Sequence, residues 1–289
     1  MNPLVSLITP VYNGMPYFKE YLDSVLNQTW RPLEFICIND GSEDDSFEYL
    51  ESLRSEFEEK GIMLKHVKGK HGGQAQALNM ALKMVTGEYI TWCDADDVML
   101  PENIEKKAVF LMENPQIGLV RNDGIRMENG KMEVIDSLPQ DRKQQNIFDA
   151  LFHDVTYCYA GCYMLRGSLL FECYPDKELP ISAEGQNLQL LLPPASRSEC
   201  GFLPEQLHIY RRRMDGHSGK KRSFTESFQR MKNFTSLKLE ILEFCQCDRE
   251  YYRNEALKIE REYQQRLLAS ATRKAREEMK HESRNSDIS

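Results

Sequence analysis

The sequence YITWCDADD, at residues 89–97, joins an uncharged apolar segment to three closely spaced carboxylates. The aromatic and β-branched residues at its start predict a buried strand, and the preceding Gly87 is a typical strand breaker. Acids this close repel one another unless another charge compensates them. The change from apolar to acidic residues therefore needs a physical explanation, and two are available.

One explanation is a divalent cation, because hard cations prefer oxygen ligands and Mg²⁺ often binds one or two carboxylates together with substrate phosphates. Side chains two residues apart in extended chain point to the same side, so Asp94 and Asp96 could face one ion while Asp97 turns away. The other explanation is a helix N-terminus, where acids are favourable and where Pro101 would begin the helix. The stretch alone supports the two interpretations equally.

The composition is that of a globular protein, with 289 residues, 41% hydrophobic and 28% charged. This length allows one large domain, or one domain with appendages. The net charge of -8 argues against a general nucleic-acid-binding role. We recognise no secretory signal at residues 1–9 and no apolar run of the ~20 residues that a membrane span needs. The eight scattered cysteines form no CxxC pairs, so we expect no zinc site and a cytoplasmic, reducing environment.

Strand and helix patterns alternate four times within the first hundred residues. Apolar segments at 4–8, 33–38, 62–67 and 89–93 predict strands, and amphipathic segments at 16–27, 46–60 and 75–85 predict the helices between them. This alternation predicts an α/β fold with a Rossmann-like, mostly parallel central sheet flanked by helices. In such sheets, ligands bind beyond the carboxyl ends of the strands.

Polar clusters at 9–13, 40–42, 68–74 and 94–97 follow the four expected strands. We therefore expect them to form one site, which makes the metal interpretation the preferred one. No GxGxxG follows the first strand and no GxxxxGK[ST] occurs, which disfavours a dinucleotide-binding enzyme and excludes a P-loop. Asp40 could accept hydrogen bonds from a ribose or a base edge. The 68–73 loop suits an anion, although an ordinary turn explains it better when it is considered alone.

Four motifs, in this order and spacing, resemble the family 2 glycosyltransferases, which have the GT-A fold. They are TPVYN at 9–13, NDGS at 39–42, GQAQALN at 73–79, and GEYI at 87–90 leading into DADD at 94–97. The resemblance implies that Asp94 and Asp96 form a DxD pair, which contacts the ribose and the Mg²⁺ or Mn²⁺ that bridges the diphosphate. It also implies a nucleotide-sugar pocket in which Asp40 reaches the nucleobase. The other candidates for that pocket are Pro10, Val11, Tyr12, Asn13, Gly41, Lys70, Gln74 and Ala95.

The catalytic base is sought near Glu184. Many family members open a helix at this place with a Glu-Asp pair whose acid is the base, but here Gly185 stands in the position of the aspartate. The following Gln186-Asn187 resembles a subgroup of the family. Glu184 is the nearest carboxylate and our candidate base, with helix capping as an equal alternative. Another register would align Gln186 with the aspartate, and glutamine cannot act as a base.

Residues 210–222 carry six cationic side chains in an acidic protein. They could form a solvated loop, or a clamp on the pyrophosphate of the donor or of a lipid-linked acceptor. The resemblance favours the clamp, because Arg213 and His217 fall where the subgroup has residues near the donor phosphates. His217 is then a further candidate metal ligand. Earlier in the chain, Gly161 could allow close approach of a sugar or acceptor.

The chain changes character at about residue 223. We expect a GT-A glycosyltransferase domain at 1–222, with a nucleotide-binding half at 1–100 and an acceptor half at 101–222. A C-terminal helical extension would follow at 223–289, ending in a disordered tail from residue 281. Apolar residues at helical spacing and charges of mixed sign suit a docking helix, or a homodimer formed through these helices.

The resemblance implies a metal-dependent inverting glycosyltransferase, using Mn²⁺ or Mg²⁺. The donor would be a nucleotide-diphosphate sugar, with UDP as the default and dTDP or GDP as alternatives. The acceptor would be a hydroxyl of a glycan or lipid-linked molecule in cell-surface polysaccharide synthesis, reached by peripheral contact with the inner face of the membrane. No nucleic-acid partner is expected. The alternatives are a nucleotidyltransferase, disfavoured because residues 9–14 lack a basic Gly-rich loop, and a nucleotide-sugar-binding scaffold that has lost catalysis at Gly185.

Overall fold

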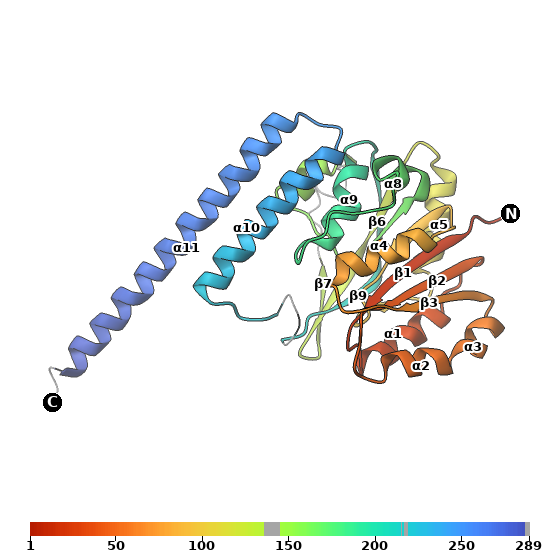
Figure 1. Cartoon of the computed structure of the whole chain (residues 1–289), viewed down its shortest axis with the longest axis horizontal. Coiled ribbons are helices and arrows are strands. Elements are labelled where there is room, and N and C mark those ends of the chain that lie inside the picture. The colour runs from red at the N-terminus through yellow and green to blue at the C-terminus, as the bar shows by residue number, and fades with distance from the viewer. Residues whose placement is uncertain (136–144, 215, 217–218, 287–289) are drawn as a thin grey trace.

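The fold is described from a computed structural model, which covers residues 1–135, 145–214, 216 and 219–286. In these residues one nine-stranded sheet is flanked by helices, and a long helical hairpin extends away from it (Figure 1). The strand order is β3-β2-β1-β4-β8-β6-β9-β5, with β7 paired to β6.

The first four strands are parallel, as the sequence predicts. They are β1 (Val5–Val11), β2 (Leu33–Asn39), β3 (Ile62–Lys68) and β4 (Tyr89–Trp92). Strand β1 lies in the middle, and its Ile8 is opposite Ile36 of β2 on one side and Trp92 of β4 on the other. The strand order therefore reverses direction at β1. This switch point is where open α/β sheets bind their ligands.

The helices of this half cover both faces of the sheet. One core cluster joins α1 (Tyr17–Leu26), α2 (Ser46–Ser52) and α3 (Arg54–Glu59) to side chains such as Leu7 and Phe35. The other cluster joins α4 (Gln74–Met84) to Ile8 and Ile36, the neighbours of those residues in the same strands. Alternate residues of one strand thus serve opposite faces, which gives the continuous apolar runs typical of a sheet buried on both sides.

The second half of the sheet is mixed. Antiparallel pairs join β8 (Tyr163–Arg166) to β4, β6 (Leu119–Glu128) to β8, and β5 (Val98–Met99) to β9 (Cys200–Arg211), whereas β6 and β9 are parallel. The hairpin from β6 to β7 (Lys131–Ile135) turns at Asn129 and Gly130, both with positive φ. The helices here are α5 (Asn103–Glu113), α7 (Phe148–Phe152), α8 (Gly167–Cys173) and α9 (Gln186–Ala195).

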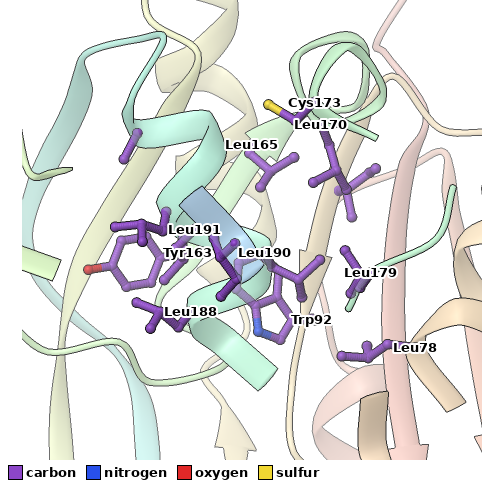
Figure 2. Close-up of a cluster of buried hydrophobic side chains, with 14 of the residues drawn as sticks. Leu78, Trp92, Tyr163, Leu165, Leu170, Cys173, Leu179, Leu188, Leu190 and Leu191 are labelled. Atoms are coloured by element: carbon purple, nitrogen blue, oxygen red, sulfur yellow. The ribbon is translucent and has the colours of Figure 1, made fainter. Parts of the chain in front are cut away.

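The C-terminal helices share a core with the sheet and the helices that cover it. Helix α10 (Phe224–Ile241) starts with a capping box between Ser223 and Glu226, and a single 3₁₀ turn, η1 (Leu242–Phe244), leads to α11 (Arg249–Ser286). Leu237 and Ile241 of α10 are buried in the cluster that contains Trp92. Figure 2 shows part of this cluster, with Leu190 of α9 close to Trp92, and Leu188 and Leu191 of the same helix close to Tyr163.

Several local predictions are corrected. The helix expected at 46–60 is divided at Leu53 into α2 and α3, and β5 and α8 were not predicted. The tail expected from residue 281 is helical as far as Ser286, and the sequence has neither Gly nor Pro there to end the helix. No helix in the described part of the chain is both long and apolar enough to span a membrane.

Candidate active site

A cavity of about 430 Å³ opens where the carboxyl ends of β1 and β4 meet the end of β9. Nine of the residues predicted from the sequence line it: Pro10, Val11, Tyr12, Asp40, Gln74, Asp94, Ala95, Asp96 and Arg213. Four further lining residues were not named individually: Gly14, Tyr210, Arg211 and Gly216, of which the last three belong to the cationic segment 210–222. The structure thus brings together segments that are more than a hundred residues apart in the chain. The volume of the cavity suits a small-molecule ligand.

The Asp40 carboxylate anchors the loop that precedes α4. Its Oδ1 accepts a hydrogen bond from the backbone N–H of Gly72 at 2.8 Å, and its Oδ2 accepts one from Gly73 at 2.9 Å. The Nδ1 of His71 lies 3.0 Å from the same Oδ2. Asp40 therefore fixes the loop at one wall of the cavity, in addition to any contact with a ligand.

Gly41, Lys70 and Asn13 were predicted in the pocket but do not line it. Gly41 has φ +77°, and a Cβ there would lie 2.7 Å from the backbone nitrogen of His71, so this position permits the close approach of the loop. Asn13 accepts a hydrogen bond from the Glu43 N–H through its Oδ1, which ties the β1 loop to the β2 loop. Gly41 and Asn13 thus support the loops around the cavity without lining it.

Tyr12 is half exposed at the cavity, and its ring stacks on His71 with the centroids 4.0 Å apart. The stacking and the contact of His71 with Asp40 bring two aromatic rings and a carboxylate together in one group. A flat aromatic face can stack on a planar ring such as a nucleobase, and a carboxylate beside it can accept a hydrogen bond from that ring. Sequence reasoning identified Tyr12 and Asp40 but not His71, whose part depends on the fold of the loop.

The acidic loop divides its three carboxylates between two environments. Asp94 and Asp96 line the cavity, and the Nε2 of Gln74 donates to Oδ1 of Asp94 at 2.9 Å. Burial, together with the charges of Asp97 and Asp96, raises the pKa of Asp94 to about 7. Asp97 is fully buried behind them and bonds to β9. The alternative interpretation of these acids as a helix N-terminus is wrong, because α5 begins only at Asn103.

The donor set at Asp94 and Asp96 fits a divalent cation. Two carboxylates face one cavity, and the pKa of Asp94 is raised first by burial and then by the charges of Asp97 and Asp96. A bound cation would favour the charged form of this carboxylate against both effects. Hard oxygen ligands of this kind suit Mg²⁺ or Mn²⁺. The third predicted ligand, His217, lies outside the described residues.

Two arginines of β9 and the following segment complete the cavity. Arg211 donates from Nε to the backbone oxygen of Asp96 at 2.9 Å, and Arg213 Nη1 lies 3.3 Å from Asp96 Oδ2. Both guanidinium groups lie over the ring of Tyr17, at 4.9 and 4.8 Å from its centroid. Arg211 also pairs with Glu20, whereas Arg212 pairs with Glu128. The cluster therefore presents Arg211 and Arg213 to the cavity.

Glu184 is buried but does not line the cavity. Its Oε2 lies 2.8 Å from the Nε of Arg230 in α10. The alternative role as a helix cap is wrong, since the N-cap of α9 is Gly185. The start of α9 is nevertheless tied to the acidic strand, because Asn187 Oδ1 accepts a hydrogen bond from Trp92 Nε1 at 2.7 Å.

Gly185 has a structural reason to replace an aspartate. Its φ is +72°, and a Cβ would lie 2.7 Å from Leu237 and 3.2 Å from Phe234 of α10. A side chain at this position would therefore be strained and would collide with the helical extension. The packing of α10 therefore leaves no room for a side chain at this position.

Comparisons with known proteins agree with this geometry. The family model described as "Glycosyl transferase family 2" matches residues 6–171. An uncharacterized glycosyltransferase of Rickettsia prowazekii is 31% identical over 173 residues, which cover 59% of this chain and 52% of that protein. The chain thus spans about half the length of this relative.

Solved structures show the same architecture at low sequence identity. S. aureus TarS, residues 1–349, in complex with UDP-GlcNAc has a TM-score of 0.63 at 18% identity, over 88% of this chain and 72% of that one. The mannosyltransferase PcManGT from Pyrobaculum calidifontis, in complex with GDP-Man and Mn²⁺, has a TM-score of 0.59 at 18% identity, over 94% and 76%. The predicted GT-A fold is confirmed, and the chain belongs to glycosyl transferase family 2.

Proposed function

We propose that this protein is a metal-dependent inverting glycosyltransferase that moves a sugar from a nucleotide-diphosphate donor to an acceptor hydroxyl. One observation carries the proposal: a single cavity has an aromatic ring and an acid on one wall, and two acids and two arginines on the other. The first wall suits a nucleoside, and the second suits a diphosphate with its cation.

The residues of the cavity would have separate roles in binding the donor. Tyr12 and Asp40 bind the nucleoside, and Asp94 and Asp96 hold Mn²⁺ or Mg²⁺. When bound, the cation neutralises the charge that develops on the departing diphosphate. Arg213, paired with Asp96, adds a second positive charge beside the same group. The role of Lys70 would be indirect, through the loop that Asp40 anchors.

Two structures of similar fold support the donor class. One contains UDP-GlcNAc, and the other contains GDP-Man and Mn²⁺. We take UDP as the default nucleotide for this chain, with GDP and dTDP as alternatives. A glycan or lipid-linked acceptor in cell-surface polysaccharide synthesis, reached by peripheral membrane contact, follows from the sequence resemblance and is part of the same proposal.

Glu184 is the proposed base, but its carboxylate already has a partner that limits its access to an acceptor. Its carboxylate is held by Arg230, so the acceptor hydroxyl would have to share or displace that partner. A base must reach the proton that it removes. The same pair motivates the competing function, a nucleotide-sugar-binding scaffold in which this carboxylate serves only to dock α10.

Product release from sugar nucleotides tests the proposal against the scaffold. The full chain is incubated with Mn²⁺ and a panel of UDP-, GDP- and dTDP-sugars, with and without sugar acceptors, and free nucleotide diphosphate is measured. Mn²⁺-dependent release from at least one donor is expected. A chain that binds a nucleotide but releases none from the whole panel would instead be the scaffold.

A further inference from the structure

A fully buried carboxylate lies behind the cavity and makes two bonds to one strand. Asp97 and His208 have relative exposures of 1% and 0%, and neither lines the cavity. Asp97 Oδ2 lies 3.0 Å from His208 Nε2, while Asp97 Oδ1 accepts a hydrogen bond from the backbone N–H of Arg211 at 2.8 Å. One side chain of the acidic loop thus holds both the first and the last residue of the segment 208–211.

The His208 ring is itself fixed by its surroundings. Gly161 has φ +81°, and a Cβ there would lie 2.3 Å from Nδ1 of the ring. Gly161 therefore admits the histidine, rather than the sugar or acceptor that the sequence led us to expect. Asn103 donates to the backbone oxygens of Gly161 and Leu207, and Lys107 donates to that of Gly161 at 2.7 Å. Helix α5 thereby supports the backbone on both sides of the ring.

The strand held by this pair carries the arginines of the cavity. The backbone of Arg211 is bonded to Asp97, and its side chain is bonded to the backbone of Asp96. Two residues later, Arg213 reaches Asp96 Oδ2. The position of β9 relative to the acidic loop therefore decides where both guanidinium groups lie.

A buried metal site is the competing explanation of the cluster. Ligand atoms of Cys93, Asp97 and His208 all lie within 4.8 Å of one another. Both oxygens of Asp97 already have hydrogen-bonding partners on β9. Hydrogen bonding therefore accounts for the buried acid without a cation.

We propose that Asp97 and His208 are positioning residues, which set Arg211 and Arg213 against Asp96 and so place the positive charge that receives the diphosphate. This inference rests on the proposed function, because it assumes that a nucleotide diphosphate binds in the cavity. It assigns a role to Asp97, the acid of the DADD motif that faces away from the cavity. It also explains why a histidine occupies the middle of a strand.

A double-mutant cycle tests the coupling. Mn²⁺-dependent UDP binding is measured by calorimetry for the full chain, His208→Leu, Arg213→Ala and the double variant, with GDP as a second probe. Residues that act through one another give non-additive effects, whereas distant and independent residues give additive ones. We expect His208→Leu to weaken binding roughly tenfold in the otherwise unchanged chain, and about twofold or less once Arg213 has been replaced.

Three further variants separate positioning from general damage. His208→Gln can still donate to Asp97, so it should retain most of the UDP affinity that His208→Leu loses. If His208→Leu does not fold, Asp97→Asn, which keeps the side-chain volume, replaces it in the double-mutant cycle. Glu34→Gln is the matched control, because Glu34 is a buried carboxylate bonded to Ser6 and Lys65 at the other end of the parallel strands. It should lower the melting temperature and leave UDP affinity unchanged.

The outcomes distinguish the two levels of the proposal. Absence of binding by the unchanged chain to either nucleotide would contradict the proposed function itself. Binding that Arg213→Ala weakens but His208→Leu leaves unchanged, or effects that simply add, would overturn the positioning role alone. About one zinc ion per purified chain, lost in His208→Gln, would establish the buried metal site instead.

Discussion

Asp94, Asp96 and Asp97 show how far adjacent residues can differ in role. Their spacing predicted that the first two would share a side and the third would turn away, and the structure places them so. The partner of Asp97 could not be predicted, because His208 is 111 residues away and the sequence around Asp97 does not indicate a contact with it. Local periodicity determines the side to which a side chain points, whereas long-range packing determines which residue it contacts there.

Replacement of Glu184 by glutamine tests the base at the residue scale. Glutamine keeps the size and can still bond to Arg230, but it cannot accept a proton. We expect turnover to fall by roughly a hundredfold or more, with nucleotide affinity unchanged. Arg230→Gln is the companion variant, which frees the carboxylate without removing it. Wild-type turnover in Glu184→Gln would exclude this residue as the base.

Lys107 gives a pH-dependent prediction. Burial lowers its pKa from 10.5 to about 7, and its Nζ donates to Gly161 O. Between about pH 7 and pH 10 the unfolded chain therefore holds more protons at this site than the folded chain, so stability rises with pH in this window. The penalty for the buried charge is fully present below about pH 7.

Lys107→Met removes this dependence. The unfolding free energy of the wild type minus that of the variant should increase from about pH 7 to pH 10, with a slope of at most ~1.4 kcal/mol per pH unit. Urea unfolding of both proteins at several pH values measures it, and groups common to both cancel in the difference. A flat or falling difference would show that the amine stays charged in the fold.

At the scale of elements, the strands were more predictable than the packing of helices upon them. Alternation of apolar and amphipathic segments predicted β1 to β4 in their parallel arrangement, and with it the edge where the motifs meet. The division of α2 from α3 was missed because nothing in the apolar pattern marks Leu53. Gly185 could be recognised as unusual, but its reason lies in Leu237 of α10.

Gly185→Ala tests the packing of α9 against α10. The variant combines strain at positive φ, about 1 kcal/mol, with a collision that adds about 1–3 kcal/mol. Gly130→Ala is the matched control, because Gly130 has φ +76° and nothing within 4 Å of the added Cβ. The first variant should be clearly less stable than the second in denaturant unfolding. Equal losses would mean that α10 does not press on this position.

At the scale of the whole molecule, the boundary expected at residue 222 separates two parts that share a core. Leu237, Ile241 and Leu242 are buried against the cluster around Trp92 (Figure 2). The far end of α11, by contrast, extends beyond the rest of the molecule (Figure 1). The sequence marks where the helices begin, through Ser223 and Glu226, but not what they cover.

Truncation distinguishes these two parts of the extension. A chain ending at residue 222 would expose the apolar surface under α10, and we expect it to lose cooperative unfolding or to aggregate. A chain ending at residue 270 keeps the packed part of α11 and should melt near the temperature of the full chain. Thermal unfolding followed by circular dichroism measures both. A stable, cooperative chain 1–222 would establish that the catalytic domain is independent of its extension.

Calorimetry of nucleotide binding with and without Mn²⁺ is the most direct test of the cavity as a metal-dependent nucleotide site. The full chain, Asp96→Ala and the exposed-residue control Asp176→Ala are titrated with UDP, GDP and dTDP. We predict that Mn²⁺ strengthens binding of at least one nucleotide in the full chain and in the control, and that Asp96→Ala loses this enhancement while its melting temperature is retained. Binding that is indifferent to Mn²⁺, or an enhancement that survives Asp96→Ala, would contradict the account.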